Sequence, residues 1–265
     1  MTSVFNNGSV TPNDLRKIIA RMVTSSGEGH IPSSYSILDI LVAIYSSITD
    51  LGQVGCEHKF VLSKGHGCAA LYVVLASRGL LDWEDINSYG TNGSRLGGHP
   101  DRNKQLPVDS NSGSLGHGFP FAVGVALANK IKGSNTAKTY VLLGDGECQE
   151  GTVWESASIA VNQELGNLTA IIDWNGSAAQ LQSKEYLLQK WEAFGWKTHT
   201  VDGHDIPKLK CLVEEIHNEV STQPTVILAR TIKGKGVSFL EGHGVWHHKI
   251  PSQDELLRIY EELDI

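Results

Sequence analysis

The sequence predicts an α/β fold, a doubly wound and mostly parallel sheet with helices on both faces. Continuous apolar runs alternate along the chain with segments of helical period, and strands that are apolar throughout are buried on both sides. The composition agrees, because 265 residues with 40% hydrophobic and 19% charged residues suffice for one large core and are too apolar for a disordered chain. We therefore expect a single domain over residues 11–265, preceded by a flexible N-terminus over residues 1–10.

The first half of the chain is expected to begin with two helices. Thr11 and Pro12 mark the start of the first helix, because threonine caps a helix and proline fits its first turn. The hydrophobic period then predicts a helix over residues 34–47, a buried strand over 59–62, a loop over 63–67, a helix that carries Leu71, Val74 and Leu75, and a capped helix start over 82–85.

From residue 118 onward, helices and strands alternate regularly. Helices are predicted over residues 118–131, 151–162, 184–194 and 206–220, and strands over 138–143, 168–173, 197–201 and 225–229. This alternation of apolar strands with helices is typical of a parallel sheet. Residues 91–114 have no predicted element, and a loop of that length inside a compact domain is usually functional.

Charge, hydropathy and cysteine spacing exclude several classes of protein. The net charge is −7 and the basic residues are scattered, whereas a nucleic-acid-binding surface needs clustered positive charge. No run approaches the ~18 apolar residues of a membrane span, and the polar N-terminus carries no apolar signal segment. The four cysteines form no Cys-x-x-Cys pair, so neither a zinc site nor a disulfide framework is expected. These observations predict a cytoplasmic protein without nucleic-acid or membrane partners.

Two strands of the predicted sheet end in polar turns. Asp145 lies between Gly144 and Gly146 directly after one strand, and Asn175 follows the next strand along the chain. Because strands linked by one helix are usually adjacent, their carboxyl ends bring a carboxylate and an amide oxygen together. Mg²⁺ prefers oxygen ligands and leaves several positions to phosphate and water. A lone Gly-Asp-Gly is more often a turn with a capping aspartate, and the second strand end is what favours a magnesium diphosphate site.

The spacing from Asp145 to Asn175 resembles the fingerprint of thiamine diphosphate enzymes. Further segments stand in the order of the transketolase family: Gly29-His30, Ser63-Lys-Gly-His-Gly67, Gly98-His-Pro100, Gly113-Ser-Leu-Gly116, Gly144-Asp-Gly-Glu-Cys-Gln-Glu-Gly151 and Val245-Trp-His247. The chain is similar to the N-terminal, diphosphate-binding (PP) domain of transketolase. It is most similar to short, split versions in which two genes encode the two halves.

The resemblance implies thiamine diphosphate and Mg²⁺ (or Ca²⁺ or Mn²⁺) as cofactors and a role for each matching residue. The implied metal ligands are Asp145, Asn175 and the backbone carbonyl of Ser177. The implied cofactor-binding residues are His66, Gly113, Ser114, Leu115, Gly144, Asp145, Gly146, Glu147, Asn175 and His247. The implied catalytic residues are His30, His66, His99 and His247, together with Glu150 in a carboxylate network between paired sites. Imidazoles suit this chemistry, because protons must move on and off sugar hydroxyls near neutral pH.

The remaining histidines are expected to be exposed loop residues without a role. They are His58, His117, His199, His204, His217, His243 and His248. His248 is also a departure from the family pattern, in which a glycine is usual at this position.

The implied function is that of one subunit of a transketolase-like enzyme, which transfers a two-carbon ketol unit from a ketose or ketose phosphate donor to an aldehyde acceptor. In the family, further domains bind the aminopyrimidine half of the cofactor and supply the activating glutamate. We therefore expect activity only with a partner subunit that carries the pyrimidine-binding and C-terminal domains, in an α2β2 assembly. Two alternatives stay open, the alpha subunit of a 2-oxo acid dehydrogenase and a catalytically silent scaffold subunit.

Overall fold

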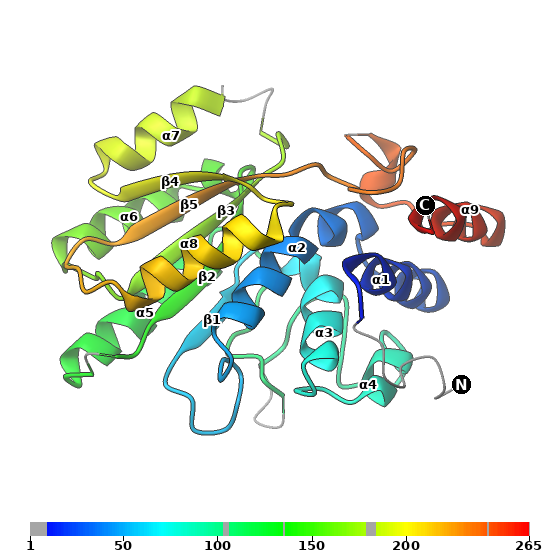
Figure 1. Cartoon of the computed structure of the whole chain (residues 1–265), viewed down its shortest axis with the longest axis horizontal. Coiled ribbons are helices and arrows are strands. Elements are labelled where there is room, and N and C mark those ends of the chain that lie inside the picture. Colours follow the sequence, from blue (N-terminus) through cyan, green and yellow to red (C-terminus); the bar gives the residue numbers. More distant parts are fainter. Residues whose placement is uncertain (1–9, 103–105, 135, 179–183, 243, 265) are drawn as a thin grey trace.

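Five parallel strands form a central sheet. The structure is a computed structural model that describes residues 10–102, 106–134, 136–178, 184–242 and 244–264, so residues 1–9 of the predicted flexible N-terminus lie outside the described part. The strands are β1 (Lys59–Leu62), β2 (Thr139–Gly144), β3 (Leu168–Trp174), β4 (Lys197–Asp202) and β5 (Thr225–Arg230). Their order is β1-β2-β3-β5-β4 and each neighbouring pair runs parallel, which confirms the predicted parallel α/β sheet (Figure 1).

The helices that accompany the strands are close to the predicted ones. They are α1 (Pro12–Ser26), α2 (Ile31–Ser47), α3 (Cys68–Ser77), α4 (Trp83–Asn87), α5 (Gly118–Ile131), α6 (Gly151–Asn162), α7 (Lys184–Ala193), α8 (Ile206–Asn218) and α9 (Gln253–Leu263), with short 3-10 turns η1 (Gly65–Gly67), η2 (Glu147–Gln149) and η3 (Val245–His247). Within the described ranges, no helix has both the length and the apolar character that crossing a membrane requires.

Strand order explains why helices cover both faces of the sheet. The chain runs from β1 through β2 and β3 to the edge strand β4, and then turns back to insert β5 between β3 and β4. Because connections between parallel strands are right-handed, a reversal of direction moves the connecting helix to the opposite face. Accordingly, α5, α6 and α7 pack around one apolar cluster, and α1, α2, α3 and α8 pack around the other. Figure 1 shows α8 crossing in front of the strands and α6 behind them.

Several element boundaries differ from the predictions. The helix α2 begins at Ile31 instead of residue 34, because Pro32 fits the first turn of a helix. Strands β2 to β5 each end one residue later than predicted, and β2 also begins one residue later, at Thr139, since ladder hydrogen bonds join backbone groups whatever the side chain. The helices α7 and α8 end one and two residues early. The described residues within 91–114 form no helix and no ladder strand, as predicted.

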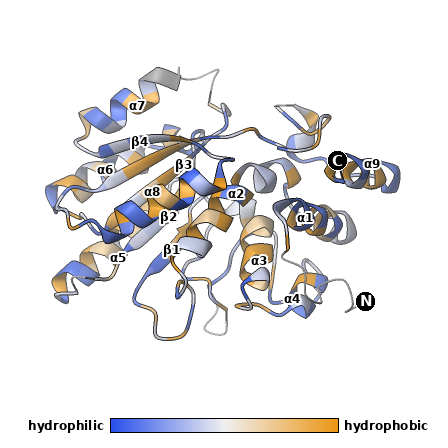
Figure 2. Ribbon diagram, in the orientation of Figure 1, coloured by the Kyte–Doolittle hydropathy of each residue, from blue (hydrophilic) through white to orange (hydrophobic). Residues whose placement is uncertain are grey.

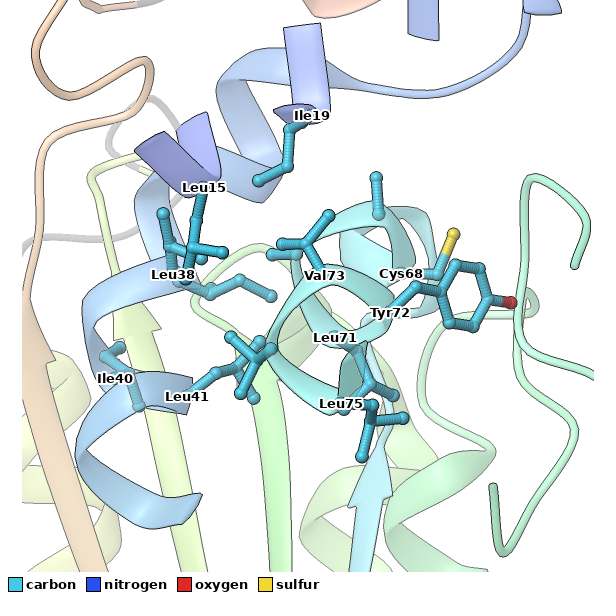
Figure 3. Packing of buried hydrophobic residues seen from close by; sticks show 14 of the residues in the cluster. Leu15, Ile19, Leu38, Ile40, Leu41, Cys68, Leu71, Tyr72, Val73 and Leu75 are labelled. Atoms are coloured by element: carbon cyan, nitrogen blue, oxygen red, sulfur yellow. The ribbon is translucent and has the colours of Figure 1, made fainter. Parts of the chain in front are cut away.

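The helix α2 is the centre of the larger core. It packs against α1, α3 and α8, and 14 of its 17 residues are buried, which leaves it no solvent-facing side. Figure 3 shows Leu38 and Leu41 of α2 pointing toward α3, with Leu15 and Ile19 of α1 beside them. The helix α3 is hydrophobic nearly throughout, whereas α8 carries many hydrophilic residues (Figure 2). The larger core is therefore built around helices that are buried on all sides.

A buried charge network joins α1 and α2 to the turn after β4. Arg16 donates to Asp39 Oδ2 at 2.6 Å, and His204 Nδ1 lies 2.7 Å from the same oxygen. The backbone N–H of Ile232 donates to His204 Nε2 at 2.8 Å, so the His204 proton lies on Nδ1 and is donated to Asp39. Burial raises the pKa of Asp39, but His204 and Arg16 outweigh it and the pKa lies below its ordinary value.

We predict that Asp39→Ala lowers the free energy of unfolding by about 3–5 kcal/mol, because it leaves the Arg16 guanidinium buried without a partner. Urea unfolding at neutral pH measures the change. The matched control is Asp264→Ala, whose carboxylate pairs with Lys17 while its side chain is 68% exposed, and the expected cost is about 0–1 kcal/mol. An equal loss of unfolding free energy in the two variants would contradict the prediction that the buried Asp39 pair stabilises the fold more than the exposed Asp264 pair.

Candidate active site

Polar turns meet at the carboxyl edge of the sheet. The segments that follow β1, β2, β3 and β5 there are residues 63–67, 144–147, 174–178 and 230–234. The first turn of α2 lies against them, since the N–H of Gly234 donates to the carbonyl of Pro32 at 3.0 Å. Ligands of open α/β sheets bind at this edge of the strands. These turns are therefore the place to test the predicted residues.

The predicted metal ligands lie side by side. Asp145 is buried, and its Oδ2 accepts from the N–H of Gly176 at 2.7 Å while its Oδ1 accepts from the N–H of Gly146 at 2.8 Å. Asn175 Oδ1 accepts from the N–H and the hydroxyl of Ser177 at 2.9 and 2.5 Å. Gly146 faces Ser177, because a β-carbon on the glycine would lie 3.9 Å from Cβ of the serine. The structure brings these predicted residues together.

Asp173 is a second carboxylate at this edge, and sequence analysis missed it. Its Oδ1 accepts from the Ser36 hydroxyl at 2.6 Å and from the Thr231 hydroxyl, and its Oδ2 accepts from Asn175 Nδ2 at 2.9 Å and pairs with Lys64. Because the amide nitrogen of Asn175 is held by Asp173, its oxygen Oδ1 is directed away from that carboxylate. One feature of the sequence could have predicted a role for Asp173: it is a charged residue inside an apolar strand run, two residues before Asn175.

Five imidazoles gather beside these turns, and we call them the histidine cluster: His30, His66, His99, His247 and His248. His30, at the N-terminus of α2, lies in the middle. Its ring centroid is 5.6 Å from those of both His66 and His247, 6.3 Å from that of His99 and 5.0 Å from that of His248. The four predicted catalytic histidines therefore lie together, although they come from η1, η3, the start of α2 and the long loop after α4.

Burial keeps two members of the cluster neutral. Burial and the neighbouring His248 lower the pKa of His30 to about 4. Burial and the Lys64 ammonium lower the pKa of His66 to about 2. At neutral pH each ring therefore carries one proton and offers one N–H donor and one acceptor nitrogen.

Lys233 is a buried cation of the same site that sequence analysis also missed. It is 7% exposed, and its Nζ lies 2.8 Å from His247 Nδ1. Burial and the charge of Lys64 lower the pKa of Lys233, while Asp173 and Asp145 raise it. The segment 231–236 lacks the Gly-Lys-Ser/Thr ending of a nucleotide-binding loop, so no sequence motif predicted a functional role for Lys233.

Glu147 joins three segments around the site. Its buried carboxylate accepts from the N–H groups of Gly116 and Gly144 at 2.8 and 3.2 Å and from the Ser63 hydroxyl. Gly116 has φ +81°, and a β-carbon there would lie 2.7 Å from Cβ of Glu150, so the turn requires glycine. Within the chain, the Glu147 carboxylate is engaged in holding turns together.

The remaining predicted site residues, Glu150 and residues 113–115, lie at the solvent-exposed rim of the site. Glu150 is exposed at the N-cap of α6. Gly113 and Ser114 are exposed and Leu115 is half-buried. The segment lies against the histidine cluster, since a β-carbon on Gly113 would be 3.4 Å from the His99 ring.

The expectation that the other histidines are exposed loop residues is wrong at several positions. His204 is largely buried in the network with Asp39. His248 is exposed outside any helix or strand, as expected, although its ring packs against His30 of the histidine cluster. His217 lies on α8 and accepts or donates a hydrogen bond with the Tyr140 hydroxyl at 2.8 Å, and His199 lies on β4. Tertiary neighbours, which local sequence does not reveal, decide these environments. His117 is exposed as expected, and His243 lies outside the described residues.

The chemistry of these groups fits a magnesium diphosphate. Asp145, Asn175 and a backbone carbonyl are hard oxygen donors, and Mg²⁺ takes only a few ligands from protein when phosphate is present. In the described part of the chain, no group of three or more His, Cys, Asp or Glu residues could hold a metal by itself, so a metal here depends on amide and carbonyl oxygens. The Lys233 ammonium contacts an imidazole, which supplies no negative charge, so an anion would stabilise it.

Comparison with known proteins identifies the family. Residues 9–263 match the family model described as "Transketolase, thiamine diphosphate binding domain". The chain belongs to the transketolase family. An apulose-4-phosphate transketolase subunit from Actinobacillus succinogenes is 38% identical, over 94% of this chain and 92% of that protein. A 6-deoxy-6-sulfo-D-fructose transketolase subunit from a Clostridium species is 36% identical, over 89% of this chain and 88% of that protein.

Longer transketolases contain the counterpart of this chain as one part. Mouse transketolase is 35% identical over 96% of this chain but only 41% of its own length. The solved transketolase of Campylobacter jejuni superposes with a TM-score of 0.79 at 28% identity, covering 97% of this chain and 46% of that one. The predicted family and fold are therefore confirmed, and the 2-oxo acid dehydrogenase alternative is not supported.

The neutrality of His66 can be tested through the pH dependence of stability. In the unfolded chain His66 takes up a proton below a pH of about 6.5, whereas burial keeps it neutral in the folded protein. The unfolded state then binds the extra proton, so stability falls as the pH falls below about 6.5. We expect this loss between pH 7.5 and 5.5 to be about 1 kcal/mol smaller in His66→Asn than in the wild type. Urea unfolding at both pH values measures it, with the exposed His117→Asn as control. Equal losses in His66→Asn and wild type would show that the folded ring takes up a proton as readily as the unfolded one.

Proposed function

We propose that this chain is the thiamine diphosphate-binding subunit of a two-component transketolase. Together with a partner subunit it transfers a two-carbon ketol unit from a ketose or ketose phosphate donor to an aldehyde acceptor. The observation that carries this proposal is the hydrogen bond that joins the Asp145 turn to the Gly176 turn beside the histidine cluster. It occurs in a chain that matches two proteins named as transketolase subunits over nearly their whole length.

The proposed cofactor site combines the Asp145 turn with Lys233. Asp145, Asn175 and the Ser177 carbonyl would hold Mg²⁺ (or Ca²⁺ or Mn²⁺), and Lys233 with the turn at Gly146 would face the diphosphate. When bound, thiamine diphosphate supplies the carbon nucleophile and the electron sink for breaking a carbon–carbon bond next to a ketone. Glu147 acts here by fixing the turns, and the rim segment 113–115 would lie on the aminopyrimidine side.

The histidine cluster is proposed to handle the substrate. Neutral His30 and His66 each offer an unprotonated nitrogen that accepts a hydrogen bond from a sugar hydroxyl. A positioned imidazole can also take a hydroxyl proton at its unprotonated nitrogen and return it, which typically contributes 10²-fold or more to the rate. The ammonium groups of Lys64 and Lys233 stabilise negative charge that develops on oxygen nearby.

A partner subunit is part of the proposal. The relatives that match over nearly their whole length are named as subunits, and the chain spans 41% of the length of mouse transketolase. Exposed apolar side chains on α5 and α6, namely Phe121, Ile131 and Ile159, give a protein partner a surface to bury. We propose that the partner carries the pyrimidine-binding and C-terminal domains, that Glu150 faces it, and that the assembly is α2β2, since closed twofold symmetry is common. A cytoplasmic location stays a prediction from the cysteine pattern.

Asp145→Asn separates the metal-binding role of this residue from its role in the fold. The amide oxygen can still accept from one of the two N–H groups that Asp145 binds, those of Gly176 and Gly146, while the negative charge is lost. We expect the affinity for thiamine diphosphate with Mg²⁺ to fall at least about tenfold, because Mg²⁺ binding depends strongly on carboxylate charge. Calorimetry on the reconstituted complex measures it, with Asp264→Asn as the control at an exposed carboxylate. Unchanged affinity in Asp145→Asn, or binding that persists in excess chelator, contradicts the metal site.

The partner requirement predicts the outcome of reconstitution. Donor cleavage is measured with this chain alone, with its companion alone and with both. We expect activity only in the mixture, because the residues assigned here bind the diphosphate end of the cofactor. Comparable turnover by this chain alone would falsify the two-component proposal, and an inactive mixture that still binds thiamine diphosphate would favour the silent scaffold.

A further inference from the structure

His248 hydrogen-bonds to the central ring of the histidine cluster. Its Nδ1 lies 3.1 Å from Nε2 of His30. The ring packs edge-on against His30 at a centroid distance of 5.0 Å and against His247 at 4.2 Å. His248 itself is exposed, so it covers the outer side of two rings to which substrate contacts are assigned.

The two nitrogens of His30 have different surroundings. Nε2 is engaged by His248, whereas Nδ1 is buried and finds no hydrogen-bond partner among the described residues. Leaving a buried polar atom unpaired costs free energy, and such atoms in native proteins usually find a partner. The described residues therefore leave a partner for His30 Nδ1 to another group, such as a substrate hydroxyl or a water molecule.

The position of the single proton on His30 determines whether Nδ1 acts as a hydrogen-bond donor or as an acceptor. His30 is neutral at neutral pH and carries one proton, either on Nε2 or on Nδ1. A proton on Nδ1 would create a buried N–H donor without an acceptor, and orphaned buried N–H groups are rarer than under-satisfied acceptors. A proton on Nε2 is instead donated to Nδ1 of His248, and the buried Nδ1 keeps its lone pair.

We infer that His248 is a positioning residue for His30. By accepting the Nε2–H of His30 it fixes one tautomer and one ring orientation, and it leaves Nδ1 as the acceptor for a hydroxyl group. The identity of that hydroxyl as one of a ketose donor rests on the proposed function, whereas the tautomer does not.

Three substitutions of His248 test which atom matters. His248→Ala removes the acceptor. His248→Asn places an amide oxygen near the position of the lost Nδ1, and His248→Gln carries its amide further out, near the former Nε2. If the Nδ1 contact is what positions His30, asparagine restores its properties and glutamine does not.

The first measurement is the tautomeric state of His30 in the full chain. Two-bond ¹H–¹⁵N correlation spectra report it directly, and His30→Asn assigns the signal by its loss. We expect the Nε2–H tautomer in the wild type and in His248→Asn, and a mixture with the Nδ1–H form in His248→Ala and His248→Gln. A wild-type Nδ1–H tautomer, or the same spectrum in His248→Ala as in the wild type, overturns the inference.

The second measurement is the kinetics of the reconstituted complex with D-fructose 6-phosphate as the probe donor. His248→Ala and His248→Gln should lower kcat/KM roughly five- to tenfold, the effect expected for one hydrogen bond, and His248→Asn should stay within about twofold of the wild type. The affinity for thiamine diphosphate should not change. An inactive wild type counts against the proposed function alone, because the tautomer spectra need no activity. An active wild type with an unchanged tautomer in His248→Ala counts against the positioning role alone.

Discussion

A buried ion pair between Lys64 and Asp173 holds the carboxyl edge of the sheet together. Their side chains are 2% and 0% exposed, and removing an ion from water costs several kcal/mol even after the protein relaxes. The hydroxyls of Ser36 and Thr231 and the amide of Asn175 offset part of this cost by donating to the same carboxylate. Because the five groups come from α2 and from the ends of β1, β3 and β5, the pair fixes the relative position of these segments. Loss of either charge would leave the other buried alone, at a cost of about 3–5 kcal/mol.

The same pair divides the site into two electrostatic halves. On one side the charge of Asp173 adds to burial in raising the pKa of Asp145, so this half favours a cation. On the other side burial, together with the charge of Lys64, lowers the pKa values of His66 and Lys233, and the His66 ring stays neutral beside the two ammonium groups. A metal ion bound to a diphosphate would fit this polarity, because the carboxylates would hold the cation and the ammonium groups would face the anion. The donors are fixed by the fold before any ligand arrives, which is the condition for strong electrostatic stabilisation.

Local patterns in the sequence predicted the parts of the molecule that depend on local physics. Apolar strand runs, the Thr11-Pro12 start and the turn at Asp145 all gave elements at the expected places. The residues that were missed are those whose role arises from tertiary neighbours. Asp173 sits inside an apolar run and reads as strand, Lys233 has no phosphate-loop ending, and His204 and His248 gain their partners from segments 165 and 218 residues away. No hydrophobic period or short motif carries that information.

The contact between α1 and α9 has a consequence for how the polypeptide acquires its structure on the ribosome. Asn13 Nδ2 donates to the carbonyl of Leu263, 250 positions later, and α9 contributes Leu256 and Ile259 to the larger core. At typical elongation rates the helix α9 emerges tens of seconds after α1. Until then one apolar side of α1 remains uncovered, and contacts of such high sequence separation also form slowly. For a long interval the nascent chain therefore exposes the apolar side of α1 to solvent, and exposed apolar surface of this kind is what chaperones bind.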